Sequence, residues 1–217
     1  MIDPSPLLVY GFVLLAIALT AAIAFLTRSL TAAVLLGAWL AVTAFLAARG
    51  VVRFDTTPPT AMILLAISLG LSLFLALSKI GGTVVERVPL AALVAVQSFR
   101  LPLELLMHRA YDEGLMPVQM SYSGRNFDIV TGITAILVAF VASRWRIVAA
   151  WNVVGFLLLL NIMTVAMLSA PLPIRVFHNE PANVWVLRAP FIWLPVFFVP
   201  VALAGHLMVW RSLRRRR

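Results

Sequence analysis

The sequence predicts an all-α membrane protein, a polytopic bundle of seven transmembrane helices. Hydrophobic residues make up 63% of the 217 residues and charged residues only 12%, about half of the charged share of soluble domains. The mean hydropathy is +1.04. The apolar residues form runs of about twenty, the length with which an α-helix crosses roughly 30 Å of hydrocarbon. Because these runs use nearly the whole chain, we expect one transmembrane domain over residues 1–217.

The first three apolar runs cover residues 7–26, 30–48 and 60–78. The flank before the first run, MIDPSP, contains no Lys or Arg, unlike a secretory signal peptide, so this run is expected to be a retained helix. Only three residues separate the first two runs, which predicts antiparallel neighbours. The third run follows a pair of prolines and ends at Lys79, where Gly81 and Gly82 indicate a helix stop.

The other four runs cover residues 88–108, 128–143, 148–170 and 187–210. The last run contains Pro190, Pro195 and Pro200 and is expected to be a kinked helix. The fourth run carries several polar residues. If it is re-entrant or interfacial, the number of spans falls from seven to six.

The distribution of basic residues predicts the orientation. Seven spans place the termini on opposite sides, and basic residues concentrate in cytoplasmic loops. With the C-terminus inside, the cytoplasmic group outnumbers the six outer residues, and it comprises Arg28, Lys79, Arg87, Arg144, Arg146, Arg211 and Arg214 to Arg217. The closing segment Arg211 to Arg217 is expected to bind anionic lipid headgroups. Arginines at the ends of apolar runs suit the bilayer surface better than nucleic acid, which we do not expect as a partner.

A polar stripe occupies one face of the fourth run. It comprises Gln97, Arg100, Glu104 and His108, which recur at offsets of 3, 4 and 4 residues and fall within an arc of about 80° on a helix. Such a stripe needs partners from other helices or a watery cleft. The spacing of Arg100 and Glu104 is that of a helix ion pair. Alternatively, Arg100 could receive an anionic group, with Glu104 as its resting partner or a proton carrier.

Further candidate ligand-binding residues flank the fifth run. Asn126 and Asp128 precede this run and suit a helix N-cap, while Thr131 lies one turn after Asp128. This helix end could also face the polar stripe. His108 could be a general base, a metal ligand or a residue of the membrane interface.

The sequence predicts no cofactor and no metal ion. It contains no cysteine, no HExxH, and no glycine-rich phosphate loop. A metal site would have to be assembled from distant residues, for which the candidates are His108, His178, Asp128 and Glu180.

The segments VQSFRLPLELLMHR and GRNFDIVTG, with NEPAN further on, resemble uncharacterised bacterial multi-pass membrane proteins with no assigned function. The resemblance covers slightly more than the C-terminal half of the chain. It implies a protein of the bacterial cytoplasmic (inner) membrane and no particular activity.

The leading functional hypothesis is binding or transport of a small polar or anionic solute at an outward-facing polar cluster. One alternative is a membrane-embedded enzyme acting on a lipid or lipid-linked substrate, with His108 and Glu104 as acid and base. Another is a structural or assembly protein whose polar residues only join helices. A through-going polar path favours transport, a one-sided pocket favours an enzyme, and self-paired residues without a cavity favour a structural role. The sequence carries no signal for an oligomeric state.

Overall fold

A computed structural model describes residues 2–215, which contain helices and no strand. The α-helices are α1 (Pro6–Thr27), α2 (Leu30–Ala48), α3 (Thr60–Leu77), α4 (Lys79–Arg87), α5 (Leu90–Val96), α6 (Arg100–Asp112), α7 (Ile129–Phe140), α8 (Trp145–Ser169) and α9 (Val199–Arg215). Short 3-10 turns cover Gln97–Phe99, Val118–Met120 and Trp185–Leu187, and a π-turn covers Leu194–Phe198. The all-α prediction is therefore confirmed.

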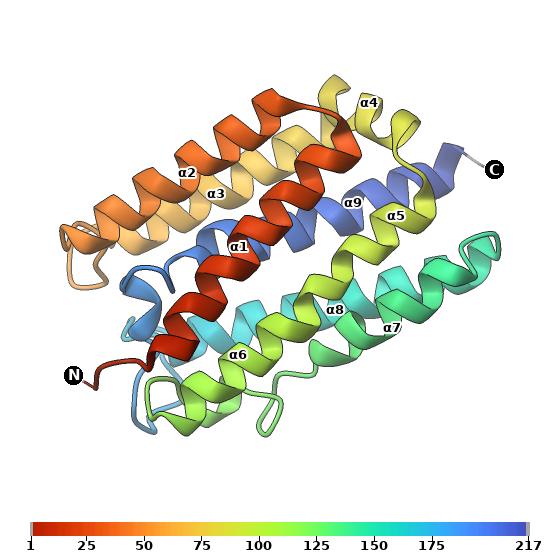
Figure 1. Ribbon diagram of the computed structural model, residues 1–217. Coiled ribbons are helices and arrows are strands. Elements are labelled where there is room, and N and C mark those ends of the chain that lie inside the picture. Colours follow the sequence, from red (N-terminus) through yellow and green to blue (C-terminus); the bar gives the residue numbers. More distant parts are fainter. Residues whose placement is uncertain (1, 216–217) are drawn as a thin grey trace.

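Six helical segments are long and apolar enough to cross a membrane. They are α1, α2, α3, the continuous segment Leu90–Asp112, α8, and the segment Leu194–Arg215. The six segments and the shorter α7, taken in chain order, alternate in direction along one bundle axis (Figure 1). The two chain ends therefore lie at opposite ends of the bundle, which we call the N-terminal end and the C-terminal end.

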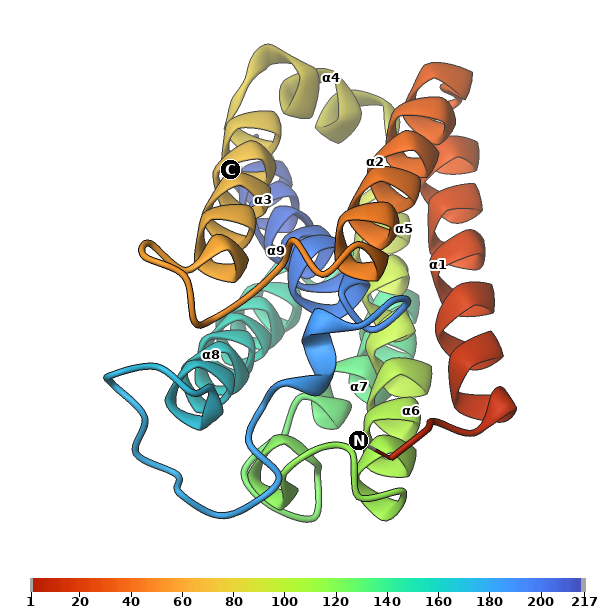
Figure 2. The ribbon, with the colours of Figure 1, turned by 90° about the vertical axis from the view of Figure 1, so that its left-hand side faces the viewer.

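The last helix lies inside the bundle. Figure 2 looks from the N-terminal end and shows α9 surrounded by its neighbours. It packs against α3, α4, α5 and α8. Near the N-terminal end the aromatic ring of Phe12 meets Trp185, Phe191 and Phe198 edge-on, with centroid distances of 5.1 to 6.1 Å. These contacts pack α1 against the segment that leads into α9.

The predicted fourth span is a single helical segment that contains a short 3-10 turn. It runs from Leu90 to Asp112, longer than the predicted 88–108, and the 3-10 turn Gln97–Phe99 separates α5 from α6. The turn lies directly before Arg100, the first residue of α6. A 3-10 turn inside a helix changes the direction of the side chains on either side of it. The interruption therefore falls inside the polar stripe.

Two predicted spans have different bounds. α7 has 12 residues, Ile129–Phe140, in place of residues 128–143, and at 1.5 Å per residue it is only about 18 Å long. The last helical segment begins at Leu194 and ends at Arg215, in place of residues 187–210. Residues 187–192, predicted as its first turns, are the end of a 3-10 turn and a loop, and Pro190 lacks an N–H donor there.

The predicted end of the third helix is confirmed, since α3 ends at Leu77, but Gly81 and Gly82 are not its stop because they lie within the next helix, α4. The chain does turn at Ser78, whose hydroxyl accepts a hydrogen bond from the backbone N–H of Ile80. A Cβ on Gly81 would meet the backbone carbonyl groups at the end of α3. These glycines therefore serve close packing of α4 rather than termination.

Candidate functional site

Arg100 is the centre of a buried polar cluster. Its side chain is 1% exposed. Its Nε donates to Oδ2 of Asp128 at 2.6 Å and its Nη2 donates to Oδ1 of the same carboxylate. Its Nη1 lies 2.7 Å from Nε2 of His206. Asp128 directly precedes α7 and His206 belongs to α9, so one guanidinium joins three elements.

The contacts of His206 determine its tautomer. A guanidinium N–H can only donate, so Nε2 of His206 must accept and carries no proton. The ring proton is therefore on Nδ1, which lies 2.8 Å from Oδ1 of Asn152 in α8. Nδ2 of Asn152 donates back to the main-chain carbonyl of His206 at 3.2 Å. His206 is consequently neutral and held on both sides of its ring.

Two glycines allow this close packing. A Cβ on Gly155 would lie 2.8 Å from the His206 ring and 2.8 Å from the Thr131 methyl group. A Cβ on Gly205 would overlap the side-chain amide of Gln97. Because real Cβ atoms do not approach so closely, α8 and α9 can take these positions only with glycine at both sites.

Glu104 lies one turn after Arg100 and has different surroundings. Its Oε2 accepts from Nδ2 of Asn126 at 2.6 Å, and Oδ1 of Asn126 accepts from the backbone N–H of Asp128 at 3.1 Å. Asn126 thus connects Glu104 to the Arg100–Asp128 pair. The other oxygen of Glu104, Oε1, has no hydrogen-bond partner within residues 2–215.

The predicted ion pair between Arg100 and Glu104 was wrong. Arg100 pairs with Asp128, because the Asp128 carboxylate presents both oxygens to the two-pronged guanidinium. Asn126, Asp128 and Thr131 do face the stripe as one interpretation predicted, and all three are buried. The Asp128 side chain makes no N-cap hydrogen bond; its Oδ1 accepts from the Thr131 hydroxyl at 3.4 Å.

The polar stripe is divided in the structure. Gln97, Arg100 and Glu104 are buried, and Nε2 of Gln97 donates to the Ala202 carbonyl at 3.4 Å. His108 is half-buried and lies outside this group. Its Nδ1 is 2.7 Å from the Ser121 hydroxyl and its ring stacks on Tyr122 at 4.1 Å. His108 therefore fixes the loop that follows α6.

Two residues of the buried polar cluster were not predicted from the sequence. His206 and Asn152 lie in apolar runs and were not among the candidates. Polar residues at such positions need partners within the protein, so their burial beside Arg100 is the outcome that this rule implies. What the sequence did not show is which helix faces they occupy.

The four candidate metal ligands are not brought together. His108 contacts Ser121, Asp128 contacts Arg100, and Glu180 pairs with Arg175 at 3.0 Å. The hydrogen bond from Arg175 lowers the pKa of the exposed Glu180 carboxyl, and the backbone N–H of Ala182 lowers it further. Within residues 2–215, no three His, Asp or Glu side chains gather as metal ligands would.

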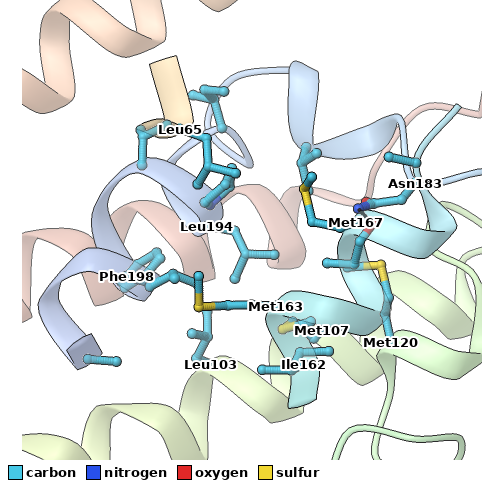
Figure 3. A pocket seen from close by; sticks show the side chains of 18 of the residues that line it. Leu65, Leu103, Met107, Met120, Ile162, Met163, Met167, Asn183, Leu194 and Phe198 are labelled. Atoms are coloured by element: carbon cyan, nitrogen blue, oxygen red, sulfur yellow. Dashed lines mark hydrogen bonds between the residues drawn. The ribbon is translucent and has the colours of Figure 1, made fainter. Parts of the chain in front are cut away.

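A cavity of about 110 Å³ adjoins this cluster. It lies between α3, α6, α8 and the segment that leads into α9 (Figure 3). Of its 27 lining residues 23 are apolar, and five of these are methionines: Met62, Met107, Met120, Met163 and Met167. The polar lining residues are Arg100, Glu104, Asp128 and Asn183. The cavity is thus apolar with a few polar groups.

Asn183 provides a second unused acceptor at the cavity. Its Nδ2 donates to the Ala166 carbonyl at 3.0 Å, whereas its buried Oδ1 has no partner within residues 2–215. Figure 3 shows Asn183 beside Met167 at one side of the cavity. Asn183 and Glu104 therefore both line the cavity, and each has an oxygen that no described residue uses, that of Asn183 being enclosed by the protein.

The fold and this site define an all-helical protein with several helices suited to a membrane and a buried polar cluster beside an apolar cavity. The chain belongs to the family described as "Domain of unknown function (DUF8737)", whose model matches residues 57–214. This confirms the predicted membership of an uncharacterised family. The match includes every residue of the polar cluster and of the cavity except Phe54. No curated protein and no solved structure matches the chain.

Proposed function

We propose that this chain is a multi-pass protein of a bacterial-type cytoplasmic membrane with seven crossings. Six segments have the required length and hydropathy, and α7 would form a short seventh crossing that begins near Asn126 and Asp128. Non-helical backbone is tolerated at membrane depth only where protein buries it. In agreement, Asn126 and Asp128, which directly precede α7, are buried. Large apolar side chains on α1 and α2, such as Phe25 and Leu30, are 81% exposed and suit lipid contact.

The charges at the two ends support an outer N-terminus and a cytoplasmic C-terminus. Within residues 2–215, the C-terminal end carries eight basic side chains and one acidic side chain, Glu86. The N-terminal end carries six basic and five acidic side chains. This asymmetry agrees with the positive-inside rule. Arg211 donates to the carbonyls of Ala76 and Ser78, so we assign the lipid-headgroup role chiefly to the rest of the tail, whose residues 216 and 217 lie outside the described range.

Single cysteines test this orientation, because the chain has none of its own. Cysteines replacing the exposed Asp3 and Ser123 should react with a membrane-impermeant thiol reagent in intact cells. A cysteine replacing the exposed Arg144 should react only after permeabilisation. Labelling of position 144 in intact cells, with protection of position 3, would invert the proposed orientation.

We further propose that the cavity binds a small, largely apolar molecule in the outer half of the bundle. The observation that carries this proposal is an apolar cavity that meets a buried polar cluster. The Arg100 fork is already occupied by Asp128, so an anion would have to displace a bidentate carboxylate. At about 110 Å³ the cavity is smaller than the roughly 150 Å³ cavity that holds benzene, so its flexible methionines must yield to a molecule of that size or larger.

The geometry favours this proposal over the two alternatives. His108 and Glu104 would have to act on one substrate in the enzyme hypothesis, yet only Glu104 lines the cavity. In the structural hypothesis the polar groups would satisfy one another without a cavity, whereas oxygens of Glu104 and Asn183 stay unused. Transport of a polar or anionic solute stays a prediction for which the apolar lining offers less support.

A cavity-filling variant tests the binding proposal. Ala166 lines the cavity in α8, so Ala166→Phe should fill it. The matched control is Ala66→Phe on the exposed face of α3. Hexan-1-ol should raise the melting temperature of the wild-type protein and of Ala66→Phe in non-ionic detergent, because a ligand that binds only the folded state stabilises it. Equal shifts in all three proteins would mean that hexanol acts through the micelle and not the cavity.

A further inference from the structure

Among the described ionisable residues that line the cavity, Glu104 is the one without an ion-pair partner. The cavity residues Arg100 and Asp128 form an ion pair, whereas Glu104 has no ion-pair partner within residues 2–215. Its neighbour Asn126 supplies a neutral amide to Oε2 only. We propose that the cavity binds a lipophilic ammonium ion, whose charged group pairs with Glu104. This inference rests on the proposed cavity binding and names the ligand class.

The charge of the whole cluster depends on Glu104. The groups that face it are Arg100 on its own helix, Asp128 before α7, and His206 on α9 behind Arg100. The positive charge of Arg100 is matched by Asp128, and His206 is neutral because its Nε2 accepts from Arg100. With Glu104 protonated the cluster is neutral, and with Glu104 ionised it holds one uncompensated negative charge. An unpaired charge in apolar surroundings is costly, and a bound cation removes that cost.

The remaining lining suits an ammonium ion with an alkyl body. An –NH₃⁺ group has three donors and no acceptor, and Oε1 of the cavity residue Glu104 is an acceptor that no residue within 2–215 uses. The 23 apolar residues, with their polarizable methionines, contact the alkyl part. A carboxylate ligand would instead place its charge beside Glu104 and Asp128. An alcohol gains a hydrogen bond but does not neutralise Glu104.

Binding of the cation competes with protonation of Glu104. Where the carboxyl is protonated before binding, its proton passes to water, and the resulting carboxylate forms the ion pair with the ammonium ion. No covalent bond of the ligand changes. Proton and cation therefore compete for one carboxylate, so the affinity for the cation falls as the pH falls, by up to about tenfold per pH unit where Glu104 is mostly protonated.

Three six-carbon probes separate the ligand classes: hexylammonium, hexan-1-ol and hexanoate. The shift in melting temperature is measured for the wild-type protein in non-ionic detergent, with Ala166→Phe correcting for effects on the micelle. Hexylammonium should stabilise most, hexanol less, and hexanoate not at all. The hexylammonium shift should grow between about pH 6 and pH 8, a range in which an alkylamine stays protonated, as Lys does.

The variant Glu104→Gln removes the charge and keeps an acceptor for Asn126. It should reduce the hexylammonium shift to that of hexanol and remove its dependence on pH. A hexylammonium shift in the wild-type protein that equals the hexanol shift, or that does not change with pH, overturns the ammonium proposal and needs no folded variant. In that case hexanol binding still supports the cavity. If no probe stabilises the wild-type protein more than Ala166→Phe, the proposed function itself is wrong.

Discussion

Arg100 and Glu104 lie one turn apart on α6, yet their surroundings differ in kind. Arg100 uses three of its donors on Asp128 and His206, which come from two other elements. Glu104 has one hydrogen-bond partner, Asn126, and lines the cavity. The guanidinium of Arg100 is thus satisfied by the protein, whereas one carboxylate oxygen of Glu104 is not. A polar residue in a membrane helix is therefore assigned to structure or to ligand binding by its partners, not by its spacing.

The difference follows from what packs around each residue. Near Arg100, Gly155 and Gly205 let α8 and α9 approach until His206 reaches the guanidinium. Near Glu104, the neighbours include the loop that follows α6 and the long side chains of Met107 and Met120. Unbranched methionine side chains fill irregular space without fixing it. Close packing by α8 and α9 on one side of the polar cluster and loose packing by methionines on the other thus leave a cavity, which Arg100 and Asp128 line together with Glu104.

The largest loss of stability is expected when the buried pair of Arg100 and Asp128 is broken. Asp128→Ala leaves the buried Arg100 without its counter-ion, and breaking a buried pair in this way costs about 3–5 kcal/mol. We expect a marked loss of folded protein in detergent, measured by size-exclusion chromatography and thermal unfolding. The matched control is Asp112→Ala, whose carboxylate is half exposed and whose loss should cost less than about 0.5 kcal/mol. Similar melting temperatures for both variants would contradict a buried pair.

The helix positions were predictable because they follow from hydropathy alone. The runs at 7–26, 30–48 and 60–78 match α1, α2 and α3 within a residue or two. The fifth run was predicted too long, since its apolar composition gives no sign that residues 141–144 turn toward α8. α4 was missed because its two glycines indicate a stop unless the close packing against the end of α3 is known.

Most residues of the site could be predicted from the sequence, but the ion-pair partner of Arg100 could not. Arg100, Glu104, Asn126, Asp128 and Thr131 were all candidates, and the structure buries all five. The spacing of four residues suggested that Arg100 pairs within its helix. A pair across elements depends on the approach of α7 and α9, which no local pattern encodes. For the same reason the part played by His206 was not visible in the sequence.

A smaller loss of stability is expected from overpacking the close contact between Gln97 and α9. In Gly205→Ala the new methyl group overlaps the side chain of Gln97, and such overpacking costs about 1–3 kcal/mol. The melting temperature should fall. The matched control is Gly70→Ala in α3, where nothing lies within 4 Å of the new atom. There the higher helix propensity of alanine should make the change neutral or stabilising by up to about 1 kcal/mol. A harmless Gly205→Ala would mean that α9 does not lie against Gln97 as described.

The smallest effect is expected at His108, the outer end of the polar stripe. His108→Ala removes the contact with Ser121 and the stacking on Tyr122. Both contacts lie on a half-buried surface, so the expected loss of stability is about 1 kcal/mol, the net value of one hydrogen bond.

His108→Ala and Glu104→Gln should differ in their effect on the binding of hexylammonium. His108 does not line the cavity, so the stabilisation by hexylammonium should persist in His108→Ala and should keep its dependence on pH. In Glu104→Gln, by contrast, the ammonium-specific part should disappear although the helix is the same and the residues are one turn apart. Tyr122→Ala serves as a second variant, because it removes the stacking while leaving the histidine in place. If His108→Ala abolishes the response to hexylammonium while Tyr122→Ala keeps it, then His108 belongs to the ligand site, and the division of the stripe between Glu104 and His108 is wrong.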